Sequence, residues 1–333
     1  MNTRLLAVLA ALTLTLTGCA AMTSDTSALT APQTLYQAVI VDPADGARLS
    51  PEQLADRLAG SRVVVVGEYH GHPASHLLQS RLQLALYQRQ PHQILSMEQF
   101  ERDHQADLDR YLAGELGEAE MIEDTGAWDN YRGSYRALVE FARQHRLPVV
   151  AANAPGALVR CVGRQGREAL ARMPAAERAW LARQPFLDSD AYQDKFADAI
   201  GGSHGTDDAS MSERMRNAYL AQLLRDNTMA ESILDALARH PGDQVLHTTG
   251  TFHSEQRLGT VAVLLQRAPD LDVTVISPVF WPTDVDDPPL PGNRDKGDYL
   301  YFIQPLPPEY QDPERAREAM RARFSGAGTG RCP

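Results

Sequence analysis

Polar side chains that could carry acid–base or metal chemistry stand at the ends of several short apolar runs. Four separate runs end in this way, at Glu68 with His70, at Glu98, at Asn153 and at His253. A carboxylate beside a histidine can activate water, and two histidines with a glutamate can instead bind one divalent metal. The same groups can also simply hydrogen-bond one another inside a binding pocket. The residue types leave these three interpretations open.

The apolar runs themselves predict an α/β fold. Six short runs alternate with helical patterns, at residues 63–66, 94–97, 148–152, 245–248, 273–276 and 299–302. Continuous apolar runs separated by helices are typical of strands buried on both faces, hence of a mostly parallel β-sheet flanked by helices. We expect the less apolar run 299–302 at an edge of the sheet. In such sheets ligands bind beyond the carboxyl ends of the strands, which is where the polar residues lie.

Helical patterns connect these strands. We expect helices at about 73–88, 212–239 and 256–266. On the long helix 212–239, Gln222 and Asp226 interrupt an otherwise apolar stripe, either to form a buried hydrogen bond or to serve a site. Residues 156–211 predict a small helical subdomain whose polar, glycine-rich part carries His204, and residues 306–333 predict a C-terminal tail with a helix.

The N-terminus has the pattern of an export signal. Arg4 precedes an apolar stretch of about a dozen residues, which is too short to span a bilayer as a helix. The run Leu16-Thr17-Gly18-Cys19 resembles a bacterial lipobox, so we expect residues 1–18 to be removed and Cys19 to be lipidated; an ordinary secretory signal is the alternative. Ala20, rather than an aspartate, favours the outer membrane, and residues 19–34 would form a tether.

Two further cysteines, Cys161 and Cys332, remain after such processing. A bridge between them would be compatible with an exported protein, but the sequence does not favour it. The chain has 333 residues, a formal net charge of −11 and an isoelectric point near 5.4. This acidic balance argues against nucleic acid as a partner, because binding phosphates requires a basic surface.

Several segments together resemble the ChaN family of haem-binding lipoproteins, within the wider group that includes Tiki proteases and erythromycin-esterase-like hydrolases. They are Val66-Gly67-Glu68-Tyr69-His70 with His76 and Gln79, Met97-Glu98-Gln99-Phe100, Trp128 with residues 135–142, residues 148–155, residues 225–230, Gly250-Thr251-Phe252-His253 and Asp298-Tyr299. These segments span about residues 55–305. We therefore expect one ChaN-like domain over residues 35–305, with the helical subdomain inserted in it.

The resemblance implies a haem cofactor, held by a tyrosine and supported by a histidine in a dimer that encloses two haems. The candidate haem ligands are Tyr135, Tyr69, Tyr219 and His204. Supporting residues of the pocket are expected to be His76, Gln79, Asn153, Gln222, Arg225 and Asp226. The function implied is haem uptake or storage at the outer membrane, with haem-uptake machinery as a partner.

The hydrolase relatives imply the alternative. In them the two Gly-x-x-His histidines and a glutamate activate water, with or without a divalent metal. His70, His253, Glu98 and Glu68 match these positions. The alternative is thus an esterase or peptidase, and a purely structural lipoprotein is the least favoured interpretation.

Overall fold

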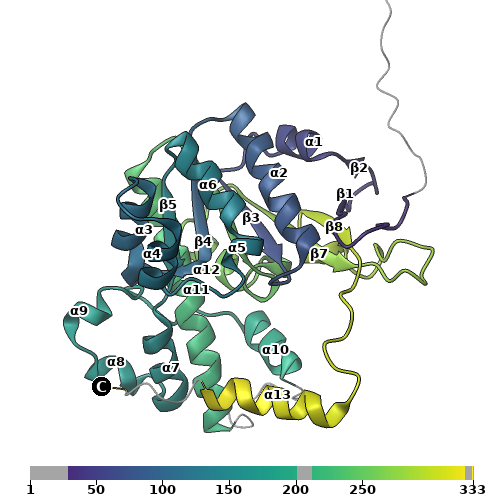
Figure 1. Cartoon of the computed structure of the whole chain (residues 1–333). Coiled ribbons are helices and arrows are strands. Elements are labelled where there is room, and N and C mark those ends of the chain that lie inside the picture. Colours follow the sequence, from purple (N-terminus) through teal and green to yellow (C-terminus); the bar gives the residue numbers. More distant parts are fainter. Residues whose placement is uncertain (1–28, 201–211, 327–331, 333) are drawn as a thin grey trace, which may run out of the picture.

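The computed structural model describes residues 29–200, 212–326 and 332, so that Cys19 and His204 lie outside the described residues. The fold is α/β, with an eight-stranded, mostly parallel sheet flanked by helices (Figure 1). The strands are β1 (Val39–Val41), β2 (Arg48–Leu49), β3 (Val63–Glu68), β4 (Gln93–Glu101), β5 (Val149–Asn153), β6 (Gln244–Gly250), β7 (Val273–Phe280) and β8 (Tyr299–Ile303). Their order in the sheet is β2-β1-β8-β7-β3-β6-β4-β5.

The helices fill the segments between the strands. They are α1 (Pro51–Arg57), α2 (Pro73–Arg89), α3 (Gln105–Leu112), α4 (Glu118–Thr125), α5 (Tyr131–Ser134), α6 (Arg136–His145), α7 (Gly156–Gln165), α8 (Glu168–Arg172), α9 (Ala175–Arg178), α10 (Asp190–Ala199), α11 (Glu213–Arg239), α12 (Thr260–Arg267) and α13 (Pro313–Gly326). Short 3-10 turns occupy Arg102–His104, Thr251–His253, Glu255–Arg257 and Arg294–Lys296. None of the described helices is long and apolar enough to cross a membrane.

The two faces of the sheet have separate cores, and β3 contributes to both. Val64 and Val66 pack with Leu78 and Leu82 of α2, in a core that also includes α1 and α3 to α6. The alternate valines Val63 and Val65 pack in the opposite core with α11 and α12. The uninterrupted apolar run of β3 is therefore required because both of its faces are covered.

Six parallel strands, from β8 to β5, end at the same edge of the sheet. The pairs β8–β7, β7–β3, β3–β6, β6–β4 and β4–β5 are all parallel. Among the described strands, the only antiparallel pairs are β1–β2 and β1–β8. The polar residues that follow the long strands are thus brought to one side of the molecule, as expected.

Three local expectations were wrong. Strand β8 is not at the edge, because β1 pairs with it on its outer side over only three residues, too short a run to recognise in the sequence. Helix α12 begins at Thr260 rather than near 256, because Gln256 and Arg257 have φ of 61° and 58°, which are not helical. Cys161 and Cys332 are disulfide-bonded with a Cα–Cα distance of 5.4 Å, a contact that 171 residues of separation concealed.

Candidate functional site

The last residue of β3, Glu68, is a buried carboxylate surrounded by hydrogen-bond donors. Its Oε1 accepts from His70 Nδ1 at 2.8 Å and from the Tyr135 hydroxyl at 2.6 Å. Its Oε2 accepts from Gln79 Nε2 of helix α2 at 2.6 Å. Gln79 in turn contacts His76, whose Nδ1 lies 3.1 Å from Gln79 Oε1 and 3.7 Å from Glu68 Oε2. Glu68 therefore fixes His70 through Nδ1, while Nε2 lies beside Gly250 at the end of β6.

Glu98 lies where the pairing of β4 with β5 loses its regular register, between Met97 and Glu101. Irregular pairing of this kind often re-aims a side chain next to a functional site. Glu98 Oε2 accepts from the hydroxyl of Thr249 and from the backbone N–H of Gly250, both at 2.7 Å. The Glu98 side chain of β4 is thus held by hydrogen bonds at the end of β6.

His253 is held from the opposite side by helix α11. After β6 ends, a 3-10 turn over Thr251–His253 carries the imidazole back over the strand end. Its Nδ1 is 2.8 Å from Asp226 Oδ1, and its Nε2 is 3.7 Å from Glu98 Oε1. Asp226 is fully buried and also accepts hydrogen bonds from the hydroxyls of Tyr192 and Thr260. This arrangement orients His253 with Nε2 towards Glu98.

Two glycines allow the strand ends to approach one another. A Cβ added to Gly250 would stand 2.8 Å from His70 Nε2, and one added to Gly67 would stand 2.8 Å from Ser254 Oγ. Both glycines lie in the β3–β6 pair, where Gly67 is opposite Thr249 and Glu68 is opposite Gly250. Both Gly-x-x-His elements therefore need their glycine for close packing.

Glu68, His70, Glu98, Asp226 and His253 form what we call the strand-end cluster. Their charges stabilise one another. Burial alone would raise the pKa of Glu98, but His253, His70 and the hydrogen bonds from Thr249 and Gly250 lower it to about 2. Burial would lower the pKa of His253, yet Asp226 and Glu98 raise it overall. The pKa of His70 is likewise raised against burial, by Glu68 and Glu98. The cluster is therefore built to keep ionised carboxylates beside imidazoles that favour a proton.

The cluster can do acid–base chemistry, whereas a ready-made metal site is less evident. His70 and His253 each have Nδ1 within hydrogen-bond distance of a carboxylate, Glu68 and Asp226 respectively. Catalytic triads use the same arrangement to present Nε2 to a substrate. Among the described residues, the one group of three metal-ligating side chains with ligand atoms within 4.8 Å of one another is Glu101, Asp103 and His104. His70, Glu98 and His253 are more widely spaced than that.

The tyrosines predicted as haem ligands differ in accessibility. Tyr135 is fully buried and its hydroxyl donates to Glu68, while the Tyr219 hydroxyl donates to Asp188. Each of these two hydroxyls is occupied by its carboxylate, so neither is available as a ligand without rearrangement. Burial and the carboxylates also raise the pKa of both phenols. Tyr69 is half-buried, with its ring stacked on Phe280 at a centroid distance of 4.2 Å.

The remaining predicted residues lie around the cluster. Asn153, at the end of β5, donates to the backbone oxygen of Glu98 at 3.0 Å and accepts from Arg225 at 3.2 Å. Gln222 is half-buried on α11, one turn before Asp226.

Sequence reasoning missed two residues that complete the cluster, Thr249 and Thr260. Thr249 stands directly before Gly250 in a buried strand, and a hydroxyl at a buried strand end was a signal that could have revealed it. Thr260 comes from α12 and carried no such signal, since only the folded chain brings it to Asp226.

Comparison with family models identifies the family of this chain. Residues 54–264 match the family model described as haem-binding uptake, Tiki superfamily, ChaN. The chain belongs to this ChaN family. The matched residues include Glu68, His70, Glu98, Asp226 and His253, so the whole cluster lies within the family region.

Among solved structures, one with a TM-score above 0.5 supports the fold. One similar structure is titled cofacial heme binding to ChaN of Campylobacter jejuni, with a TM-score of 0.59, 15% identity, and coverage of 80% of this chain and 97% of that chain. A mutant of the erythromycin esterase EreC in its open conformation has a TM-score of 0.45, 13% identity, and coverage of 84% and 86%. A Bacillus cereus protein has a TM-score of 0.43, 13% identity, and coverage of 85% and 78%. No curated protein sequence matches the chain.

Proposed function

We propose that this ChaN family member binds haem at the carboxyl ends of its parallel strands and serves haem uptake or storage. The observation that carries the proposal is the family match over residues 54–264, which includes every element of the cluster. The similar Campylobacter jejuni structure, which is titled for cofacial haem binding, supports the same ligand.

The residues at the end of β3 fit such a ligand. Tyr69 and His70 are adjacent, and the His70 side chain is 43% exposed. The Tyr69 ring lies on Phe280, and the His70 ring meets Trp128 edge-on at 4.9 Å. Haem needs apolar and aromatic walls together with an oxygen or nitrogen ligand for its iron, and this surface offers both.

Of the four candidate ligands, we propose Tyr69 as the iron ligand, with His70 as the supporting histidine. A phenolate is a hard anionic ligand that favours ferric iron. Burial and Glu255 raise the pKa of Tyr69, so the phenol stays protonated until a cation binds to it. Tyr135 and Tyr219 are engaged by carboxylates, as described above, and His204 lies outside the described residues.

We also propose the cellular setting that the sequence predicts. Cys19 would anchor the protein in the outer membrane through a lipid, and two protomers would enclose haem between their strand ends. A lipid-anchored protein with an exchangeable haem could pass it to haem-uptake machinery. The partial exposure of Tyr69 and His70 supports this, because haem held by buried side chains would exchange slowly.

Titration of the mature chain with hemin tests the binding proposal. Wild type should give a saturable Soret band, and Tyr69→Phe should lose affinity by about tenfold or more, since it removes the anionic ligand. Tyr310→Phe, at a half-exposed tyrosine distant in sequence from the cluster, is the matched control and should behave like wild type. Glu98→Gln should retain the band.

A hydrolase is the second candidate, and one specific observation favours it. Asp226 fixes His253 Nδ1 at 2.8 Å while His253 Nε2 faces Glu98, an acid–base pair that a simple carrier does not require. Turnover of ester or peptide panels that disappears in Glu98→Gln or His253→Ala, without any saturable change in the hemin spectrum, would replace haem binding by this function. Loss of that turnover on chelation would add a divalent metal.

A further inference from the structure

The backbone turn that carries His253 is irregular. It follows β6 as two consecutive 3-10 turns, Thr251–His253 and Glu255–Arg257. Gln256 and Arg257 have φ of 61° and 58°, a left-handed conformation that costs free energy in residues other than glycine. Such a conformation persists only where the surrounding structure holds it in place. The contacts around this turn therefore decide where the His253 ring lies.

Helix α10 supplies such contacts through Lys195. The Nζ of Lys195 donates to the backbone oxygen of Phe252 at 3.1 Å and to that of Glu255 at 3.4 Å. It also lies 3.4 Å from Glu255 Oε1 and 5.0 Å from the centroid of the Phe252 ring. The two backbone oxygens stand on either side of His253, one residue before it and two residues after it. Lys195 thus holds the backbone on both sides of the imidazole.

The Lys195 ammonium is buried and fully engaged, since its side chain is only 12% exposed. Burial of an ammonium is costly unless its N–H groups are hydrogen-bonded, and it has three of them. The two backbone oxygens and the Glu255 carboxylate supply three acceptors. Lys296, the other lysine of the sequence, lies 3.9 Å from Glu255 Oε2 and so faces the carboxylate rather than the backbone. The two lysines therefore hold different parts of the turn.

Helix α10 also holds the carboxylate that orients His253. Tyr192, three residues before Lys195, donates its hydroxyl to Asp226 Oδ2 at 2.6 Å. Residues three apart are neighbours on one helix face. Asp226 Oδ1 in turn lies 2.8 Å from His253 Nδ1. One helix therefore fixes both members of the His253–Asp226 pair, the carboxylate through Tyr192 and the turn through Lys195.

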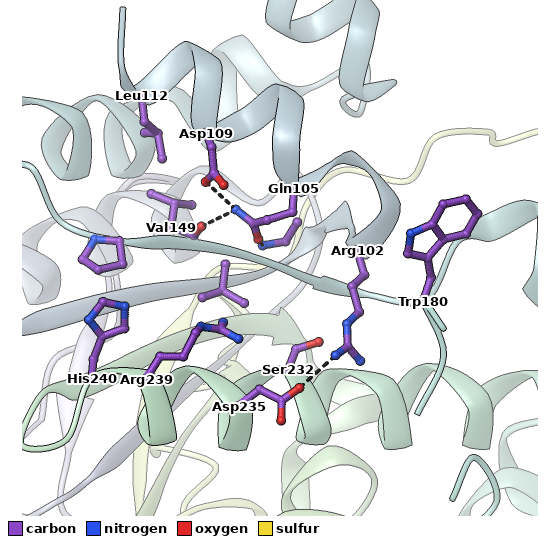
Figure 2. Close-up of a pocket in the computed structure, with 13 residues that line it drawn as sticks. Arg102, Gln105, Asp109, Leu112, Val149, Trp180, Ser232, Asp235, Arg239 and His240 are labelled. Carbon is purple, nitrogen blue, oxygen red and sulfur yellow. Dashed lines mark hydrogen bonds and ion pairs between the residues drawn. The ribbon is translucent and has the colours of Figure 1, made fainter. Parts of the chain in front are cut away.

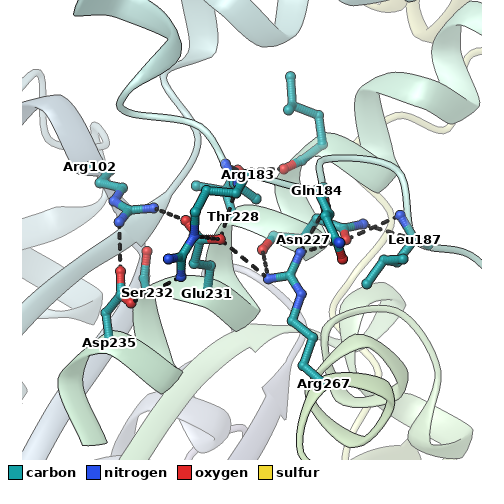
Figure 3. Close-up of polar contacts among 12 residues, drawn as sticks. Arg102, Arg183, Gln184, Leu187, Asn227, Thr228, Glu231, Ser232, Asp235 and Arg267 are labelled. Carbon is teal, nitrogen blue, oxygen red and sulfur yellow. Dashed lines mark hydrogen bonds and ion pairs between the residues drawn. The ribbon is translucent and has the colours of Figure 1, made fainter. Parts of the chain in front are cut away.

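The segment that leads into α10 is fastened to α11 and α12 (Figure 3). The N–H of Leu187 donates to Asn227 Oδ1 at 3.2 Å, and Asn227 Nδ2 donates to the backbone oxygen of Leu187 at 3.0 Å. Arg267 donates to the backbone oxygen of Gln184 at 2.7 Å. Lys195 is thus presented by a helix whose approach is fixed.

The hollow along the free edge of β5 is separate from this arrangement. It has a volume of about 400 Å³, and none of its lining residues belongs to α10 or to the turn after β6 (Figure 2). Asp109 of α3 and the exposed Arg239 of α11 line it with opposite charges, so it selects no charge in a ligand. A change at Lys195 therefore does not act through this hollow.

We propose that Lys195 is a positioning residue of the strand-end cluster: it fixes the turn after β6 so that His253 Nε2 faces Glu98. Asp226 orients the imidazole ring and Lys195 fixes the backbone, so the two act on different parts of one residue. The inference goes beyond haem binding, because it concerns the acid–base pair of the cluster and uses neither of the residues proposed to hold haem.

A histidine NMR titration of the haem-free mature chain tests the proposal. Burial lowers the pKa of His253, but Asp226 and Glu98 raise it overall. Lys195→Met should lower this pKa by about 0.5 or more, because the released turn carries the ring away from both carboxylates. Loss of the lysine charge alone would raise the pKa instead. The sign of the change therefore separates positioning from electrostatics.

Two variants serve as matched controls. Lys195→Arg keeps N–H donors for the backbone oxygens and should keep the wild-type pKa of His253. Lys296→Met removes an equal charge from Glu255 and leaves the contacts to the backbone of the turn, so it should keep that pKa as well. Hydrogen exchange of the Leu258 amide, which donates to the Glu255 backbone oxygen at 3.3 Å, should become faster in Lys195→Met alone.

An unchanged or raised His253 pKa in folded Lys195→Met would overturn the proposal, and so would an equal decrease in Lys296→Met. Thermal unfolding checks that each variant is folded. If Lys195→Met is not, Lys195→Gln replaces it with the same expected decrease, since its shorter side chain does not reach both backbone oxygens. Because the titration is made without haem, its outcome is independent of hemin binding, and the two proposals fail separately.

Discussion

At Glu98, several neighbours act on one buried carboxylate. Burial opposes its ionisation, yet His253, His70, Thr249 and Gly250 lower its pKa to about 2 from an ordinary 4.5. A carboxyl whose pKa is lower in the folded state adds stability above its unfolded pKa and loses that contribution as pH falls towards the folded one. This places the effect of Glu98 in the window between about pH 4.5 and pH 2.

We predict that Glu98→Gln flattens the acid side of the stability profile. At pH 7 the variant should lose about 3 kcal/mol of unfolding free energy, the amount that this pKa shift represents, and the difference from wild type should shrink as pH falls through the window. Urea unfolding at about pH 7, 5 and 3 measures this. A constant difference between variant and wild type at all three values would contradict the charge account.

His70 and His253 give a pH dependence of stability that is opposite in sign to that of Glu98. The pKa values of His70 and His253 are raised above 6.5 by Glu68, Asp226 and Glu98, against the effect of burial. Their contribution to stability is therefore complete below about pH 6.5 and is lost as pH rises through the raised values.

At the scale of elements, the close approach of β3 and β6 depends on glycine. Gly250 has an ordinary φ of −60°, so an alanine there causes no backbone strain, but its Cβ would meet His70 Nε2 at 2.8 Å. We predict that Gly250→Ala folds but displaces the His70 ring from the end of β6. An NMR titration should then show the pKa of His70 lower than in wild type, because its electrostatic interactions with Glu68 and Glu98 are weakened.

Gly60→Ala is the matched control, since nothing lies within 4 Å of a Cβ at that glycine. The His70 pKa in this control should equal that of wild type. A wild-type His70 pKa in a folded Gly250→Ala variant would show that the two strand ends tolerate a side chain between them.

The elements were predictable where a local pattern was long enough. The apolar runs of β3, β4, β5 and β6 predicted buried parallel strands, and the polar residue after each predicted their common edge. Strands β1 and β2 have three and two residues and left no such pattern. The partners of the cluster that lie on helices, such as Tyr192 with Asp226, depend on packing between distant elements, which composition and periodicity do not encode.

At the scale of the whole molecule, the tail returns to the body of the protein. The disulfide joins Cys332 to Cys161 of α7, and Cys332 also packs against the apolar core of the helical region. An exported protein would meet oxidising conditions in which such a bond persists. The disulfide is therefore consistent with the export that we propose from the N-terminal sequence.

We predict that Cys19→Ser abolishes lipidation, because no thiol remains to carry the lipid. The variant should appear as uncleaved precursor or in the soluble periplasmic fraction, in contrast to membrane-associated wild type. Cell fractionation with mass spectrometry of the N-terminus measures both properties. Membrane association and processing equal to wild type would contradict the lipoprotein proposal.

The central claim is that a tyrosine at the end of β3 holds ferric haem. Resonance Raman spectroscopy of the hemin-loaded protein tests this most directly, because a bound phenolate has its own vibrational signature. We predict a high-spin ferric spectrum with tyrosinate bands in wild type, in Tyr135→Phe and in Tyr219→Phe, and the loss of those bands in Tyr69→Phe alone. Tyrosinate bands that persist in Tyr69→Phe would contradict the assignment, and their absence from wild type would contradict the tyrosine-held haem itself.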